Sequence, residues 1–334
     1  MNVIKIIKSR IMLIVFFLMA ITNLRAQNIT GERRVYYLDA TYSMVSNKLW
    51  EPSKDNLIKA IENIEDVNTE LVVIVFADDV NSKKKVWKKW EIKATTSDKD
   101  KLIKEIEGLA KPVTSSMTNL YDPWNDFYSE IKKDKVNYMF LMTDGGHEQG
   151  GDFFGLIDQW KRRTNSYTYG FFVELTENVG SKEVKARDKA RIHIDRQKER
   201  LWRVSSADMN INLIRLGKSV TYNVRGDKYI DIPLFFSGKD KSVINKLKFD
   251  FENNSDFKIR QIDFLDNIIR IFIDKNINIH TYPTDSETSL NVKLDETNDK
   301  TFLLTNKIVI RSYLSIPESQ PVPFPESWRD TPAH

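Results

Sequence analysis

Two acidic residues follow two separate apolar runs, and the first is soon followed by two hydroxyl residues. Asp39 comes directly after Val35–Leu38, and Thr41 and Ser43 stand two and four positions beyond it. Asp144 comes directly after the second run, Tyr138–Thr143. Hard divalent cations such as Mg²⁺ take about six oxygen ligands near 2.0–2.1 Å and give up their waters reluctantly. Carboxylates and hydroxyls on fixed backbone, with positions left open, suit that chemistry, so the pattern indicates an oxygen-ligand site.

The elements that must position these residues follow from the hydrophobic pattern. Short apolar strands alternate with amphipathic helices from Arg33 to about Gly217, which predicts an α/β fold. We expect a doubly wound, mostly parallel, Rossmann-like sheet with helices on both faces. Ligands bind such sheets beyond the carboxyl ends of the strands, where the strand order reverses. Asp39 and Asp144 should therefore meet there, and a dication would relieve the repulsion between them.

The pattern changes after Gly217, where apolar and polar residues alternate with a period of two. Many short, half-buried strands of this kind predict an all-β, Ig-like sandwich over residues 218–315. The α/β domain should cover residues 28–217, with a helix over Ile211–Leu216 as its last element. Residues 316–334 form a Pro-rich tail that should be extended or disordered.

The N-terminal residues are typical of a secretory signal peptide over residues 1–26. Three basic residues precede the apolar run Ile11–Ile21, and Ala26 offers a small residue at the cut before Gln27. Because eleven apolar residues are short for a membrane span of about 20, we expect no stable span in the mature chain. An uncleaved anchor is the alternative. The product should be exported, to the periplasm, the cell surface or the medium.

Charge and cysteine content exclude several classes of function. The chain has 51 Lys and Arg against 47 Asp and Glu, but the first 26 residues hold four bases and no acid. The mature chain is thus formally neutral, which gives no support for nucleic acid or an anionic membrane as partner. Cysteine is absent, so disulfides, thiolate zinc sites and cysteine nucleophiles are excluded.

Three short motifs together resemble the metal-ion-dependent adhesion site (MIDAS) of von Willebrand factor type A (VWA) domains. They are Asp39-x-Thr41-x-Ser43, Thr118-Asn119-Leu120 and Thr143-Asp144-Gly145. That family's pattern is Asp-x-Ser-x-Ser, a distant Thr and a distant Asp, and the resemblance covers roughly residues 30–217. The sequence departs from it in two places. Threonine stands at position 41 where serine is usual, and the residues before Thr118 are Ser115-Ser116-Met117 rather than glycines.

The resemblance implies a role for each site residue. Thr41 and Ser43 would bind Mg²⁺ (or Mn²⁺) directly, and Thr118 directly or through water. Asp39 and Asp144 would act mainly through water, and an acidic group on a protein partner would complete the shell. A vestigial, metal-free site on a scaffold protein is the alternative.

An enzyme is a further alternative, because Asp39 after a strand resembles the nucleophile of haloacid-dehalogenase-like phosphatases. Those enzymes use a second Asp two residues on as general acid. Thr41 stands there and cannot protonate a leaving group at neutral pH. We therefore expect a non-enzymatic, adhesion-type binding protein.

Other candidates have plainer interpretations. His147 and Glu148 either flank the ligand face or lie in a solvated loop. His193 and His280 lack metal-ligand spacing and are expected to be structural or on the surface. The lysines and tryptophans of residues 83–90 resemble a nucleic-acid patch, but lysines also protect edge strands from aggregation, and we favour that interpretation.

Overall fold

The computed structural model describes most of the chain between residues 29 and 314. The described ranges are 29–79, 84–113, 116–145, 151–175, 181–197, 199–205, 211–252, 257–275, 285–295 and 300–314. The expected signal peptide, the Pro-rich tail, Lys83, His147, Glu148 and His280 lie outside them. The chain forms two compact units, and the change from the first to the second falls between Asn212 and Leu213. No helix of the described residues is long and apolar enough to span a membrane.

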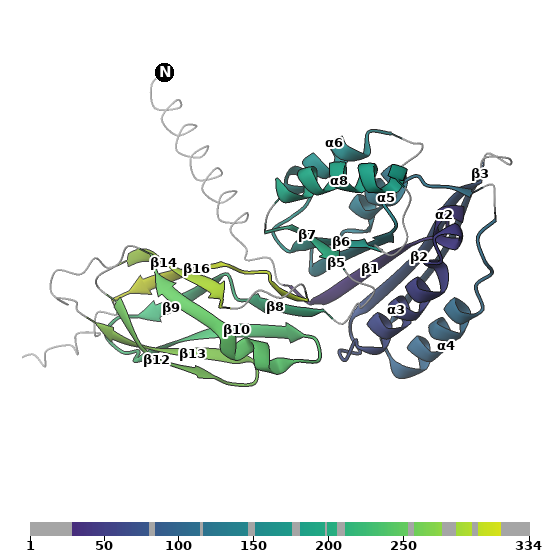
Figure 1. Cartoon of the computed structure of the whole chain (residues 1–334). Helices are drawn as coiled ribbons and strands as arrows, with labels where there is room; N and C mark the ends of the chain where they lie inside the picture. The colour runs from purple at the N-terminus through teal and green to yellow at the C-terminus, as the bar shows by residue number, and fades with distance from the viewer. Residues whose placement is uncertain are drawn as a thin grey trace, which may run out of the picture. The chain divides into compact units, whose positions relative to one another are not determined.

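The first unit is built on one mixed sheet with the strand order β3-β2-β1-β5-β6-β7 (Figure 1). Neighbouring strands are parallel except at β3, which pairs antiparallel with β2 and ends the sheet as the expected edge strand; β4 pairs antiparallel with β2. The strands are β1 (Gly31–Asp39), β2 (Glu70–Asp79), β3 (Lys84–Lys93), β4 (Ser116–Met117), β5 (Lys135–Thr143), β6 (Thr168–Glu174) and β7 (Leu201–Ser205).

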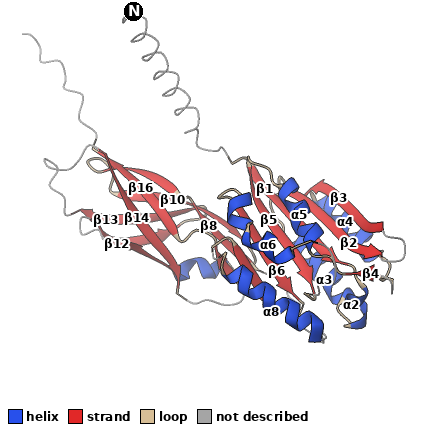
Figure 2. Cartoon of the chain, turned by 90° about the horizontal axis from the view of Figure 1, so that it is seen from above, coloured by secondary structure: helices blue, strands red, loops and turns tan. Residues whose placement is uncertain are grey.

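Helices cover both faces of this sheet, with α3 and α4 on one face and α5, α6 and α8 together on the other (Figures 1 and 2). The predicted α/β class, with a mostly parallel sheet, is therefore confirmed. The helices are α2 (Tyr42–Ser46), α3 (Trp50–Glu62), α4 (Thr96–Glu107), α5 (Tyr121–Glu130), α6 (Phe153–Asp158), α7 (Trp160–Arg163) and α8 (Ser181–Asp195).

An aromatic ladder of one residue per strand runs across the middle of the sheet. Tyr36 stacks on Phe140 with ring centroids 4.6 Å apart, Phe140 stacks on Phe171 at 4.9 Å, and Phe171 stacks on Trp202 at 5.4 Å. These are register partners on β1, β5, β6 and β7. A slip of one residue would turn each ring to the opposite face. The ladder thus fixes the register of these strands and, with it, where their carboxyl ends lie relative to one another.

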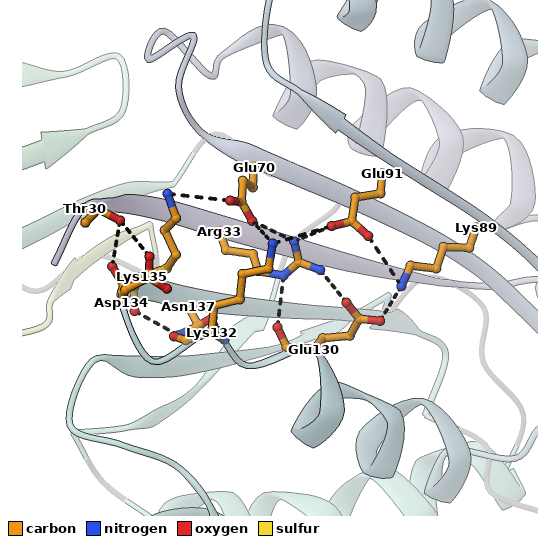
Figure 3. A network of polar contacts seen from close by, with 10 residues as sticks. All are labelled: Thr30, Arg33, Glu70, Lys89, Glu91, Glu130, Lys132, Asp134, Lys135 and Asn137. Atoms are coloured by element: carbon orange, nitrogen blue, oxygen red, sulfur yellow. Dashed lines mark hydrogen bonds and ion pairs between the residues drawn. The ribbon is translucent and has the colours of Figure 1, made fainter.

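A buried ionic cluster closes the opposite end of the sheet (Figure 3). Arg33, only 2% exposed, pairs with Glu70 and Glu91 at 2.9 Å each and also with Glu130. Lys132 adds a further contact to Glu70 at 2.7 Å. A buried guanidinium needs such partners, because an uncompensated charge in the interior is strongly destabilising. The charged residues at that end of the sheet therefore have a structural role.

The second unit consists of two sheets around one apolar core. Their strand orders are β12-β13-β10-β8-β15 and β11-β14-β16-β9, and inward residues of both sheets form a single buried cluster. The elements are β8 (Asn212–Leu216), β9 (Ser219–Asn223), β10 (Tyr229–Ser237), the 3₁₀-helix η1 (Lys241–Lys246), β11 (Leu247–Phe251), β12 (Phe257–Phe264), β13 (Ile268–Lys275), β14 (Asp285–Leu294), β15 (Thr301–Leu303) and β16 (Lys307–Tyr313).

This unit is all-β, as the alternating pattern predicts, apart from the short η1. One element prediction was wrong: residues 212–216 form a strand of the second unit, not a closing helix of the first. All five are buried, Asn212 and Arg215 included, so the polar residues of this run do not mark a solvent-facing side as they would on an amphipathic helix. The Ig-like label and the independent folding of the two units stay predictions.

Candidate metal centre

The strand order of the first unit reverses between β1 and β5, and both predicted acids lie at that point. Asp39 is the last residue of β1, and Asp144 directly follows the last residue of β5. β1 and β5 are hydrogen-bonded neighbours running in the same direction. Their carboxyl ends therefore bring the two acids to one place, the position at which ligands bind in open α/β sheets.

Both carboxylates are buried, with side chains that are 0% exposed. The Oδ1 atom of Asp39 accepts a hydrogen bond from the backbone N–H of Thr41 at 3.0 Å, and its Oδ2 atom accepts one from Thr143 Oγ1 at 2.7 Å. Burial, together with the charge of Asp144, raises the pKa of Asp39 from its ordinary value of 3.8 to about 7, although these hydrogen bonds act to lower it. Within the described residues, no basic side chain hydrogen-bonds to Asp39.

The three predicted hydroxyls form a short chain beside these acids. Thr118 Oγ1 donates to Thr41 Oγ1 at 3.0 Å, and Thr41 Oγ1 shares a hydrogen bond with Ser43 Oγ at 3.1 Å. Thr41 is the N-cap residue of α2, yet its side chain makes no capping hydrogen bond. A threonine at this position usually accepts from a backbone N–H of the first turn. Its hydroxyl instead faces the site.

The structure thus brings together all five residues predicted from the sequence: Asp39, Thr41, Ser43, Thr118 and Asp144. The donors fit a small, hard cation. Around an octahedral ion with bonds near 2.1 Å, neighbouring ligand oxygens lie about 3.0 Å apart, and the hydrogen-bonded hydroxyl oxygens, at 3.0 and 3.1 Å, are close enough to one another to share such an ion. Because the charge of Asp144 raises the proton affinity of the buried Asp39, this pair of carboxylates would also gain from a nearby dication.

Two residues that the ligand prediction did not include help to hold this geometry. Asn47 Nδ2 donates to Asp144 Oδ2 at 3.2 Å, and Thr143 Oγ1 both donates to Asp39 and accepts from the backbone N–H of Gly145 at 3.1 Å. Thr143 was visible as part of its motif. The sequence gives no indication that Asn47 belongs to the site. Asn47 is the C-cap residue of α2, and it reaches Asp144 only because the end of this helix lies beside the end of β5.

The remaining candidates have structural roles where they are described. His193 on α8 contacts Asp158 at 2.9 Å and packs against Phe154. On β3, Lys88 pairs with Glu105 at 2.9 Å, and Lys89 pairs with Glu130. These contacts use the lysines within the fold, which agrees with the edge-strand interpretation.

Gly145 is a position where the site depends on glycine. Its φ of +90° is rarely adopted by other residues, and an added Cβ would lie 3.0 Å from the Cβ of Arg187. We expect Gly145→Ala to lower the free energy of unfolding by about 1–3 kcal/mol, measured by chemical denaturation. Gly108→Ala is the matched control, because Gly108 ends α4 with an ordinary φ of −74°. Equal stability of the two variants would contradict the strain argument.

Among known proteins, the comparisons found similarity to solved structures. No protein-family model and no curated protein matches the sequence. The chain resembles proximal thread matrix protein 1 from the mussel byssus, with 14% identity over 47% of this chain and 41% of that one and a TM-score of 0.37. It therefore spans less than half of that protein. A second structure of the mussel protein has a zinc-occupied MIDAS motif.

Two bacterial structures are similar at the same level. An aerotolerance-related membrane protein from Bacteroides fragilis shares 14% identity over 53% of this chain and 94% of that one, with a TM-score of 0.39. A von Willebrand factor type A protein from Catenulispora acidiphila shares 10% identity over 86% of this chain and 67% of that one, with a TM-score of 0.39. At likeness this low, the residues of the site have to carry the functional argument.

Proposed function

We propose that this chain is an exported, non-enzymatic binding protein of the VWA type. Its first unit would hold Mg²⁺ or Mn²⁺ at the strand ends of β1 and β5 and present it to an acidic group on a protein partner. The observation that supports this best is the buried pair Asp39 and Asp144 beside three hydroxyls that lie within hydrogen-bond distance along a short chain. In this proposal Thr41, Ser43 and Thr118 supply neutral oxygens, and the two acids supply charge.

The weak ligand set is what suits the site to binding a carboxylate. With neutral hydroxyls in direct contact and the two acids acting mainly through water, the ion would remain a strong Lewis acid, so an anionic oxygen from outside would be attracted to it. The ion would contribute a Lewis-acidic contact point. The protein's own residues would orient it and keep its open side facing the partner.

A metal-free scaffold is the competing proposal, and one observation favours it. The hydroxyl chain and the hydrogen bonds of Asp39 are already complete within the protein. Direct metal binding separates the two proposals. Hydrated Mn²⁺ has a sharp electron paramagnetic resonance signal that is lost on binding, and Mg²⁺ should restore it by competition.

We expect one Mn²⁺ per chain for the protein beginning at Gln27. Thr41→Ser should bind similarly, because the ligating hydroxyl survives, whereas Thr41→Val and Asp144→Asn should bind much more weakly. An Mn²⁺ signal that the protein leaves unchanged would favour the scaffold.

Hydrolase activity is expected to be absent. The hydroxyls hydrogen-bond to one another, and no histidine of the described residues is placed to take a proton from them. Phosphomonoester and peptide substrates should show no turnover with Mg²⁺ or Mn²⁺. A turnover that the wild type shows and Asp39→Asn loses would instead support the phosphatase-like alternative.

A further inference from the structure

Arg187 on α8 has a buried guanidinium whose polar atoms are not all satisfied. Arg187 is only 8% exposed, and neither its Nε nor its Nη1 atom has a hydrogen-bond partner among the residues that the structure describes. Buried charged donors are nearly always paired, because an unmade hydrogen bond of this kind is strongly unfavourable. Such a group in a native structure calls for a partner, and the described residues do not supply one.

The stem of Arg187 lies close to the candidate metal centre. A Cβ built on Gly145 would lie 3.0 Å from Arg187 Cβ and 3.4 Å from its Cγ, so the stem of the arginine packs against Gly145. Gly145 directly follows the buried Asp144. The unsatisfied guanidinium is therefore carried on a side chain that starts beside the candidate metal centre.

The next arginine along the same helix provides a comparison. Arg191 lies one turn after Arg187, and its guanidinium binds Glu174 through Nε at 3.0 Å and Nη2 at 2.7 Å. Glu174 is the last residue of β6 and pairs in register with Thr143 at the end of β5. The acid at the end of β6 thus has its own arginine. Arg187, in contrast, has no hydrogen bond or ion pair to an acid of the described residues.

We propose that Arg187 is a specificity-determining residue that binds the carboxylate of the incoming partner. One carboxylate oxygen would complete the shell of the metal, and the other would accept from the guanidinium. Arginine suits that second oxygen, because its guanidinium is always charged and holds its N–H donors in a fixed plane, whereas lysine is a flexible point charge. This inference rests on the proposed function and adds to it: the site selects a carboxylate from a protein partner over a neutral oxygen ligand.

Acetate is a suitable probe, with acetamide as its neutral counterpart. Protein-bound Mn²⁺ accelerates the relaxation of methyl protons on a molecule in its coordination shell, so nuclear magnetic resonance gives the affinity of each probe. Mn²⁺ affinity is measured separately by electron paramagnetic resonance. We expect wild type to prefer acetate, and Arg187→Met to weaken acetate binding about 10- to 100-fold, the range for hydrogen bonds to charged groups.

Metal affinity distinguishes recognition from a structural role. Removing a positive charge near the site should leave Mn²⁺ binding by Arg187→Met unchanged or tighter, while acetate binding falls. A merely structural arginine would weaken both together. Arg187→Lys should recover only part of the acetate affinity, and Arg196→Met, which removes a 59% exposed charge just beyond α8, should change neither.

Two results would overturn the proposal in distinguishable ways. If wild type binds Mn²⁺ but Arg187→Met keeps its full acetate affinity, the role of Arg187 is wrong and the metal site stands. If wild type fails to bind Mn²⁺, the metal site is wrong, and the proposal for Arg187 is lost with it.

Discussion

Mg²⁺ at a hundredfold excess over its dissociation constant is expected to raise the free energy of unfolding of the first unit by about 2.7 kcal/mol. The site exists only when β1, β5 and the segment carrying Thr118 are folded together. An ion that binds the folded state alone must stabilise it by mass action. The melting temperature should therefore rise with Mg²⁺ concentration and fall back when chelator is added.

Tryptophan fluorescence is a selective measure of this effect, because six of the seven tryptophans belong to the first unit. Asp144→Asn should abolish the difference between Mg²⁺ and chelator, and Thr41→Val should reduce it. Thr41→Ser and Asp55→Asn are the controls that should retain it, the latter because Asp55 is exposed on α3. Identical melting curves for wild type in Mg²⁺, Mn²⁺ and chelator would leave the metal-free scaffold as the better proposal.

In chelator, the free energy of unfolding is expected to fall as the pH rises from about 4 to about 7. The folded pKa of Asp39, about 7, lies above its ordinary value of 3.8. Between these values the folded state holds a proton that the unfolded state has released, so raising the pH favours unfolding. At 1.36 kcal/mol per pKa unit, the loss amounts to up to about 4 kcal/mol and levels off above pH 7.

Denaturant titrations between pH 5 and 8 test this directly. In that range Glu70 and Glu91 do not interfere, because pairing with basic side chains lowers their pKa values and the stabilisation they give is lost only under more acidic conditions. Asp39→Asn should remove the slope and exceed wild type in stability at pH 8 in chelator. Mg²⁺ should flatten the slope of wild type, since the ion favours the ionised pair. A wild-type stability that stays flat or rises with pH in chelator would contradict the buried-pair argument.

The site could be predicted because its signals are local. Each acid stands at the end of an apolar run, and the buried parallel strands read as continuous hydrophobic segments. Strand order was not visible in this way, but the rule that ligands bind where the order reverses made the meeting of Asp39 and Asp144 a natural expectation. The structure places β1 and β5 side by side, as that rule requires.

The parts that could not be predicted depend on contacts between distant segments. Arg187 meets Gly145 only because α8 packs beside the end of β5, and nothing in the composition of that charged helix distinguishes it from Arg191. The helix prediction for residues 212–216 was wrong for another reason. Residues 212–216 read Asn-Leu-Ile-Arg-Leu, and a run of five residues is too short for its hydrophobic period to separate a buried strand from a helical turn.

The wide sequence spacing of the site also has a kinetic consequence. The hydrogen bond from Thr143 to Asp39 joins residues 104 apart, and that from Thr118 to Thr41 joins residues 77 apart. Because closing such long loops is costly in entropy, we expect these contacts to be incomplete in the transition state for folding. Interactions absent from the transition state change the unfolding rate and leave the folding rate alone. A cation held by these residues would thus lengthen the lifetime of the folded protein without helping it to fold.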